Sequence, residues 1–322
     1  MKAAAPRRRH PESSLEEEPI GDVVTLRGSG GAIKEWTRTG WLTSPARDRM
    51  LSVVNGPSTY WDGISDQIAG HYYHDAVIGR IKRNAHLRLI ARWGGDLRSK
   101  VVLKTDLFEE AHGSDQFLFE LPKDAVRVGI DIAPVIVRRA GQQAHAAGTA
   151  LPLLLAGDVL ALPFRADTCD VVISNSTLDH FPERRLIEVA LRELHRVLKP
   201  GGILVVTFDN PHSLSYLAGR LKRLLRPDPF YLGRTLSREA LAETLARLGY
   251  HVTDTTAIIH GLENHSSAMM WAASRIGGPR LAAAIGRLLD LLERLEATPT
   301  RYLTGAFVAA RAVKPGQPAR DA

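Results

Sequence analysis

Cysteine, long apolar runs and a secretory leader are all scarce or missing in this sequence of 322 residues. Its one cysteine, Cys169, has no partner for a disulfide within the chain, which is typical of a protein in a reducing compartment. The longest apolar stretch, TALPLLLAGDVLALPF, is interrupted by Gly157 and Asp158, so we predict no membrane-spanning helix. The opening residues, MKAAAPRRRHPESSLEEEP, contain no apolar signal region. We therefore expect a cytoplasmic protein.

The composition is otherwise ordinary for a globular protein, with 44% hydrophobic and 24% charged residues. The formal net charge of +7 is a mild excess of positive charge for this length. Because the sequence reveals no single basic face, charge alone does not predict a nucleic-acid partner. The arginine run at 7–9 is the one feature that keeps a macromolecular acceptor, protein or RNA, open.

Changes in composition divide the chain into four consecutive segments: 1–20, 21–97, 98–314 and 315–322. The first has an arginine run, a glutamate run, proline and serine, and is expected to be a disordered arm. The second is irregular at first and then helical over 58–93, where apolar residues recur every three or four positions. The third alternates strand and helix patterns, and the fourth is a short tail.

Seven short apolar or β-branched runs of the third segment are expected to be strands: 100–104, 126–131, 151–158, 169–175, 201–209, 251–259 and 303–313. An amphipathic helix at about 184–198 presents Leu186, Leu194 and Val197 on one face. A helical insertion at 262–296 precedes the last strand. Strands that alternate with helices predict an α/β fold, a Rossmann-like and mostly parallel sheet with helices on both faces.

Ligands of such a sheet bind outside the carboxyl ends of its strands, so the residues at those ends are the candidate site. Asp131 ends the second strand, where a carboxylate can accept both ribose hydroxyls or simply favour the next helix. Asp158 ends the third strand, where it can accept an adenine amino group or shape a turn after Gly157. Asn175 and Ser176 lie at the end of the fourth strand.

Four polar residues follow the fourth and fifth strands at the same edge: Asp179, His180, Asn210 and His212. A histidine can act as a general base near neutral pH, or it can be held structurally by a neighbouring carboxylate or backbone group. We predict His180 as the first candidate base, with Asp179 as an orienting or alternative group. His212 is the second candidate.

Four of these stretches, VGIDIAP, AGDVLALPF, CDVVISNSTLDHF and RVLKPGGILVVTFD, come in the order and spacing of class I S-adenosylmethionine-dependent methyltransferases. The chain resembles that family over about residues 98–260 and 302–314, and most closely its small-molecule branch that includes quinone-biosynthetic enzymes. The resemblance implies a seven-stranded sheet with an antiparallel last strand and S-adenosylmethionine as cofactor. It also implies transfer of a methyl group to a small molecule whose identity stays open.

The same resemblance implies which residues contact the cofactor: Asp131 and Ile132 at the ribose, Asp158 and Val159 at the adenine, and Asn175 and Ser176 at the methionine part. Methyltransferases that modify exocyclic amino groups of DNA bases usually carry a proline-proline-aromatic turn after the fourth strand, where this chain has NSTL. Nucleic acid is therefore not expected as the acceptor.

The family's first motif is a strand followed by a glycine-rich turn, and here the sequence departs from it. Lys104, Thr105 and Asp106 follow the first strand, and no glycine occurs before Gly113. In one interpretation, Asp106 and Glu109 form a capping box for a short helix that Gly113 ends, and Asp106 pairs with a buried Lys104. In the other, Lys104 binds the carboxylate of the cofactor, and Thr105 or Asp106 takes its amino group.

The acidic residues and the histidine of this turn could also act as metal ligands: Asp106, Glu109, Glu110 and His112. Acids in the first turn of a helix usually serve the helix dipole, so no metal is predicted. The altered turn also leaves a rival interpretation of the whole chain. In it, a methyltransferase-like protein binds the cofactor or another ligand without methyl transfer, as a cyclase or a binding subunit does.

The acceptor should be bound by parts outside the sheet, for which the helical segment 58–93 and the insertion 262–296 are the candidates. Met269, Met270 and Trp271 of the insertion suit an adaptable lid over an apolar substrate. Ordinary packing on the sheet, a membrane-surface helix and a homodimer interface are the alternatives.

Overall fold

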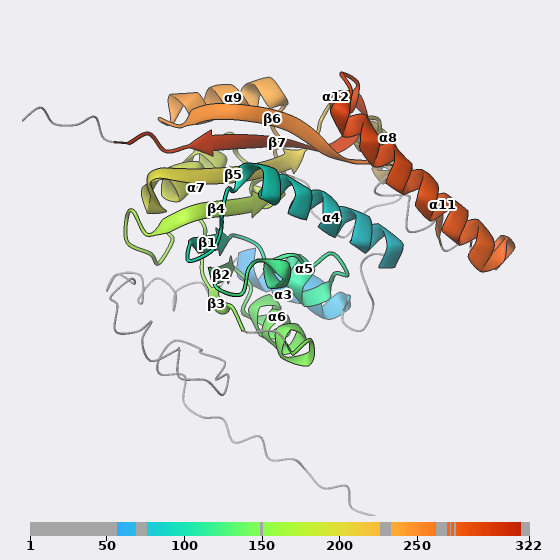
Figure 1. Cartoon of the computed structure of the whole chain (residues 1–322), viewed down its shortest axis with the longest axis horizontal. Coiled ribbons are helices and arrows are strands. Elements are labelled where there is room, and N and C mark those ends of the chain that lie inside the picture. The colour runs from blue at the N-terminus through green and yellow to red at the C-terminus, as the bar shows by residue number, and fades with distance from the viewer. Residues whose placement is uncertain are drawn as a thin grey trace, which may run out of the picture.

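One sheet of seven strands organises the protein (Figure 1). The computed structural model describes residues 57–68, 76–148, 151–225, 233–261 and 269–316, except 271 and 274. The strands are β1 Val101–Lys104, β2 Val126–Asp131, β3 Leu153–Ala156, β4 Cys169–Asn175, β5 Leu198–Asp209, β6 His251–His260 and β7 Gly305–Val313. Their order is β3-β2-β1-β4-β5-β7-β6, and β7 runs antiparallel to both neighbours. This confirms the predicted α/β fold; the predicted arm at 1–20 lies outside the described residues.

Alternate residues of the central strands face two separate cores, which is why these strands are continuous apolar runs in the sequence. Val101 and Leu103 of β1 belong to the first core, together with Val172 of β4. Val102 of β1 and Val171 of β4 belong to the second. Successive side chains of a strand point to opposite faces, so a sheet with two buried faces requires apolar residues at every position.

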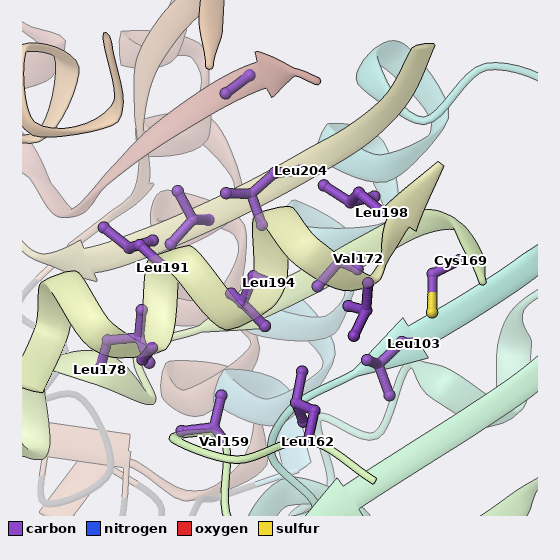
Figure 2. Packing of buried hydrophobic residues seen from close by; sticks show 14 of the residues in the cluster. Leu103, Val159, Leu162, Cys169, Val172, Leu178, Leu191, Leu194, Leu198 and Leu204 are labelled. Atoms are coloured by element: carbon purple, nitrogen blue, oxygen red, sulfur yellow. The ribbon is translucent and has the colours of Figure 1, made fainter. Parts of the chain in front are cut away.

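Helices α7 (Arg184–Val197) and α9 (Arg238–Arg247) cover the first core. Leu191 and Leu194 of α7 are fully buried and lie over Val172 and Leu204 of the sheet (Figure 2). The helix agrees with its predicted span to within one residue, because its apolar side chains recur at helical spacing. The second core is covered by helical elements that precede or follow β1 and β2: α4 Ala76–Trp93, α5 Phe108–His112, η1 Leu118–Glu120 and α6 Pro134–Ala146.

Residues 58–93, expected to form one helical segment, form two helices with different places. α4 packs Leu89 and Trp93 against β5, β6 and β7, so it belongs to the core of the sheet. The preceding helix, α3 (Pro57–Gln67), instead lies against α6, where Asp62 Oδ1 accepts a hydrogen bond from the backbone N–H of Val135 at 3.0 Å. α3 therefore lies at the start of α6, directly after the carboxyl end of β2.

The insertion before the last strand contains α11 (Gly278–Leu292), η3 (Glu293–Ala297) and α12 (Arg301–Thr304). Met270 and Leu289 are buried against Ile78 and Ile81 of α4. α11 thus packs on α4, as an ordinary helix does, whereas η3 and α12 contact β6 of the sheet. Trp271 lies outside the described residues. In the part of the chain that the structure describes, no helix combines the length and the apolar character needed to cross a bilayer.

Candidate active site

The carboxyl ends of β1, β2 and β4 meet at the point where the strand order reverses. Lys104 of β1 is in register with Gly129 of β2 on one side and with Ile173 of β4 on the other. Asp131, two residues further along β2, is in register with Ala156 of β3. The chain leaves β1 toward one side for β2 and β3 and returns on the other side for β4. This reversal is where open α/β sheets bind their ligands.

Lys104 is fully buried at this point, and its three N–H donors are all used inside the protein. Its Nζ donates to the backbone oxygen of Asp106 and to Glu110 Oε2, both at 2.6 Å, and to Glu109 Oε2 at 3.1 Å. Burial lowers the pKa of Lys104, but the Glu110 and Glu109 carboxylates outweigh it and raise that pKa above its usual value. Lys104 therefore has no donor left for a cofactor carboxylate. Its pairing is internal, but with the carboxylates of Glu110 and Glu109 instead of the Asp106 carboxylate that the sequence suggested.

The predicted capping box is wrong, although Gly113 does end the short helix as expected. The helix begins at Phe108, whose backbone N–H donates to Asp106 Oδ1 at 2.7 Å, so Asp106 forms a tight turn with the residue two positions on. Glu109 does not return to the turn as a capping box requires. It accepts instead from Lys104 and from the side-chain amide of Asn175.

A glycine in the neighbouring strand makes room for the turn that follows β1. The side chain of Leu107 is fully buried over Gly129 of β2, where an added Cβ would lie 2.5 Å from Leu107 Cδ2. The backbone N–H of Leu107 donates to Asp131 Oδ2 at 3.0 Å. The turn thus fills the space above β2 with a side chain and uses its amide to hold Asp131.

Asp131 is held by two backbone amides and keeps capacity for a ligand. Oδ2 accepts from Leu107 N, and Oδ1 accepts from Ala133 N at 2.8 Å. An ionised carboxylate has about four lone-pair sites, so about two stay open. Burial raises the pKa of Asp131 to about 6, against the two amides that lower it. The carboxylate is therefore poised to accept further hydrogen bonds, from ribose hydroxyls for example.

The tip of β4 carries a buried acceptor without a partner. Asn175 Nδ2 donates to Glu109 Oε1 at 3.2 Å, whereas Asn175 Oδ1 is buried and accepts no hydrogen bond in the described structure. Burial raises the pKa of Glu109, but Lys104 outweighs it and holds that pKa at about 2. An ionised carboxylate and an unsatisfied amide oxygen therefore lie together at this edge, which is an environment for a cationic donor.

Asp179 has a structural role instead of the predicted orienting one. Its Oδ2 accepts from Ser176 Oγ at 3.0 Å and from the backbone N–H of Asp209 at 2.8 Å, and its Oδ1 accepts no hydrogen bond. Neither oxygen therefore bonds to His180. Ser176 has a φ of 47°, a conformation uncommon for a residue other than glycine. Asp179 holds this turn against the end of β5.

Three further residues were predicted to contact the cofactor: Thr105, Asp158 and Val159. They differ in which of their polar groups remain available to a ligand. Thr105 is buried, and its hydroxyl donates to Ser174 Oγ at 3.0 Å, so it joins β1 to β4 instead of facing a ligand. Asp158 Oδ1 accepts from Leu160 N at 2.8 Å, as in the turn that the sequence left open, and its Oδ2 accepts nothing from the described residues. Val159 packs its side chain into the first core, which leaves its backbone for a ligand.

α3 crosses this edge and packs an aromatic side chain on the candidate base. The ring centroids of Trp61 and His180 are 4.8 Å apart in an edge-on arrangement, and Phe108 contacts the same indole at 6.3 Å. Ser65 Oγ lies 2.7 Å from His112 Nε2, which fastens α3 to α5. The sequence placed Trp61 in a helix but contained no signal that this helix would cover the strand ends.

The two polar residues that follow β5, Asn210 and His212, differ in their exposure to solvent. His212 is exposed on the turn after the strand, and its backbone N–H donates to Asn210 Oδ1 at 3.1 Å. Asn210 is buried, and its amide donates to the backbone oxygens of Tyr302 and Gly305. Asn210 therefore anchors α12 and β7 to β5, and His212 remains at the rim.

A cavity of about 440 Å³ opens beside the loop that carries His180. It is lined by residues of that loop and of the segment that enters α9: Pro182, Glu183, Arg184, Arg234, Thr235, Leu236, Ser237 and Ala240. The backbone N–H of Arg234 donates to the oxygen of Phe181 at 2.8 Å, and a Cβ at Gly233 would lie 2.2 Å from that oxygen. Glycine is needed there because the neighbour is backbone, which cannot rotate away.

Glu110 and His112, two of the possible metal ligands, already make hydrogen bonds to other protein groups. Glu110 Oε1 accepts from the backbone N–H groups of Phe117 and Leu118, its Oε2 accepts from Lys104, and His112 faces Ser65. Within the described ranges, no three His, Cys, Asp or Glu side chains gather as a metal site would require.

Known proteins with similar sequences are methyltransferases. A profile described as a methyltransferase domain matches residues 111–206. A protein of Mycolicibacterium smegmatis, named a probable S-adenosylmethionine-dependent methyltransferase, is 28% identical over 131 residues, 41% of this chain and 46% of that protein. A demethylmenaquinone methyltransferase of Streptomyces griseus is 37% identical over 75 residues, 23% of this chain and 31% of the relative. The chain thus spans less than half the length of the curated relatives it matches.

The fold recurs in solved structures of low sequence identity. The crystal structure of the [4+2]-cyclase SpnF superposes with a TM-score of 0.50 at 20% identity, covering 80% of this chain and 95% of that one. At this identity the likeness shows a common fold and nothing about the reaction.

Proposed function

We propose that this chain is a class I S-adenosylmethionine-dependent methyltransferase and that it transfers a methyl group from S-adenosylmethionine to a small molecule. The observation that carries the proposal is the pair of Glu109 and Asn175 at the tip of β4. One supplies a carboxylate held ionised by Lys104, and the other a buried oxygen without a donor. The cofactor brings an ammonium group and a sulfonium, which are the charges that such a pair favours.

The cofactor would lie along the strand ends, held by side chains that still have hydrogen-bonding capacity. The Asp131 carboxylate, next to Ile132, accepts the ribose hydroxyls with the lone pairs that Leu107 and Ala133 leave open. Asp158 Oδ2 and the backbone of Val159 bind the adenine. When bound, the cofactor supplies a methyl group already activated by its positive sulfur.

The methionine part of the cofactor would bind to side chains at the ends of β1 and β4, and not to the backbone of a glycine-rich turn. Asn175 Oδ1 accepts from the ammonium, Glu109 supplies the opposite charge, and Ser176 lies next to them. Lys104 positions Glu109 without touching the ligand, because all its donors are used internally. In this chain a buried ion pair thus replaces the backbone contacts of the family's first motif.

The acceptor would enter on the side of η2 (Leu178–His180) and the cavity beside it. His180 would remove a proton from an acceptor hydroxyl or acidic carbon as the methyl group is transferred. The contact with the Trp61 ring would hold the imidazole in one orientation. The exposed His212 is the second candidate. A cavity of about 440 Å³ has the size of a small-molecule site.

Titration calorimetry of S-adenosylmethionine and S-adenosylhomocysteine tests the cofactor site. Both ligands should bind the wild type, and Asn175→Leu should weaken both by about 10-fold, since a hydrogen bond to a charged group contributes about 1.5–3 kcal/mol. Glu109→Gln should weaken S-adenosylmethionine more than S-adenosylhomocysteine, because only the former carries the sulfonium charge. Failure of the wild type to bind either ligand would refute the proposal, provided that the protein melts cooperatively.

The base can be tested once a screen for release of S-adenosylhomocysteine has identified an acceptor. His180→Gln should lower kcat by about 100-fold or more at saturating acceptor with little change in KM, as expected for a lost general base. His212→Gln is the matched variant and should keep most of the turnover. Equal turnover of wild type and His180→Gln would remove His180 from the mechanism.

A second candidate function is ligand binding, or a cyclisation, without methyl transfer. It is favoured by the glycine-free turn, whose amides at Leu107 and Phe108 are already bound to Asp131 and Asp106. The similar fold of a chain named as a [4+2]-cyclase makes the alternative concrete. Binding of the cofactor without release of S-adenosylhomocysteine across the whole acceptor screen would favour it.

A further inference from the structure

The outward face of α11 combines exposed leucines with basic side chains. Leu281, Leu288 and Leu291 are 40%, 54% and 51% exposed, although Leu289 on the opposite side of the helix is buried against α4. Leucines exposed along one helix face leave an apolar stripe that packing inside the described chain does not cover.

The acidic side chains of this region all turn toward α4, where arginines pair with them. Arg80 contacts Asp290, Arg88 contacts Glu293 and Arg92 contacts Glu296, at 2.9, 2.9 and 2.8 Å. The sequence shows both signs of charge on this insertion, which argues against a membrane-surface helix. In the folded protein the negative charges are neutralised on the inner side, so that objection no longer applies.

The remaining arginines lie on the outside. Arg280, Arg287 and Arg294 are exposed, recur every seven residues and make no ion pair with any described residue. Residues seven apart on an α-helix lie almost above one another. Arg280 and Arg287 of α11 therefore lie almost one above the other beside the leucines, and Arg294 follows in η3. Asp290, the acid of α11, is paired with Arg80.

The apolar character continues from α11 toward α8 (Leu214–Leu225), which contacts α12 (Figure 1). Leu303 of α12 is 48% exposed. On α8, Leu214, Leu217 and Leu221 are 54%, 53% and 62% exposed. Three neighbouring helical elements thus each present leucines to the outside.

We propose that the outer face of α11 and η3, with Arg280, Arg287, Arg294, Leu281, Leu288 and Leu291, binds the surface of an anionic lipid bilayer. The leucines would enter the boundary between headgroups and acyl chains, and the guanidinium groups would bind lipid phosphates. A second copy of the chain is a poorer occupant. A two-fold interface places the same patch on both sides and would bring unpaired arginines against each other.

The test is vesicle flotation of the full chain with phosphatidylcholine vesicles and with vesicles of phosphatidylcholine and phosphatidylglycerol in equal parts. The protein should float with the anionic vesicles only. A triple variant, Arg280→Gln, Arg287→Gln and Arg294→Gln, should bind on the order of 100-fold more weakly, since each basic residue near an anionic surface contributes about fivefold. Leu288→Asp should also lose binding while the three arginines remain.

A matched triple variant removes the same charge elsewhere: Arg138→Gln, Arg165→Gln and Arg185→Gln, all exposed and without ion pairs. It should float like the wild type. Equal loss in both triple variants would mean that net charge alone drives the attraction, and would overturn the assignment to α11. So would absence of wild-type binding, or a dimer in light scattering that Leu288→Asp dissociates in protein that does not float. None of these outcomes depends on cofactor binding.

Discussion

Lys104→Met should lower the free energy of unfolding by about 3–5 kcal/mol, the usual cost of removing one partner of a buried ion pair. The change leaves the buried carboxylate of Glu110 facing an apolar side chain, and Glu109 loses the ammonium that holds its pKa at about 2. Methionine is close in length to lysine, so little of the loss comes from a cavity. Urea unfolding followed by circular dichroism measures it.

The control for this prediction lies at the other end of the same strand. Lys100 is about half exposed and faces Asp170 at 3.7 Å, so Lys100→Met should cost less than about 1 kcal/mol. Adding Glu110→Gln to Lys104→Met should recover about 1–3 kcal/mol, because the second change removes the buried unpaired charge. If Lys104→Met and Lys100→Met cost the same, the ion pair does not organise the turn.

Asp131→Ala should weaken binding of S-adenosylhomocysteine by about 100-fold, if its carboxylate accepts both ribose hydroxyls as proposed. Hydrogen bonds to a charged group contribute about 1.5–3 kcal/mol each, and two are lost. Asp170→Ala is the matched variant, because Asp170 also accepts a backbone N–H, that of Val101 at 2.9 Å, but at the opposite edge of the sheet. Its affinity should stay within about threefold of wild type. Calorimetry measures both, and melting without ligand checks that each variant is folded.

The raised pKa of Asp131 predicts that a fall in pH weakens the binding of S-adenosylhomocysteine but stabilises the free protein. The pKa of Asp131 is raised to about 6 by burial, so affinity should fall by up to about tenfold per pH unit below 6, as the carboxylate takes up its proton. Stability of the free protein should rise over the same interval toward the unfolded value near 3.8, because a raised carboxyl pKa means that folding favours the protonated form.

Several neighbouring groups could contribute to these profiles and can be separated. The pKa values of His86 and His112 are lowered to about 4 by burial, so both imidazoles stay neutral between pH 5 and 7. Burial raises the pKa of Asp115 to about 6 and that of Asp106 well above its usual value, and both act on stability in the same direction. The dependence of affinity on pH should flatten in Asp131→Asn. An unchanged profile would assign it to Asp106 or Asp115.

The strands, the main helix and the edge that carries the site follow from local patterns. Apolar runs of strand length, each ending in a polar residue, are visible without any partner, and their alternation with helices implies a parallel sheet. For that reason Asp131 and Asn175 end their strands as predicted, and α7 agrees with its predicted span to within one residue. Asp158 lies two residues beyond β3, which ends at Ala156 and not at 158 as expected. The strand-end positions of the candidate site were therefore determined by the sequence alone.

The tertiary structure decided which groups pair, and these pairs join residues whose relation no local pattern encodes. Lys104 pairs with two glutamates of the next helix, α5, and not with a ligand. Gly129 of β2 makes room for the side chain of Leu107, in the turn that follows β1. α3 and α4 share one helical pattern, yet α3 packs against α6 and α4 packs against β5, β6 and β7. On α11, pairing with arginines about 200 residues away turns the acids inward and leaves a basic face outside. Hydrophobic periodicity predicts which face of a segment is buried. Which charged side chains pair depends on the tertiary packing that brings them within a few ångströms of each other.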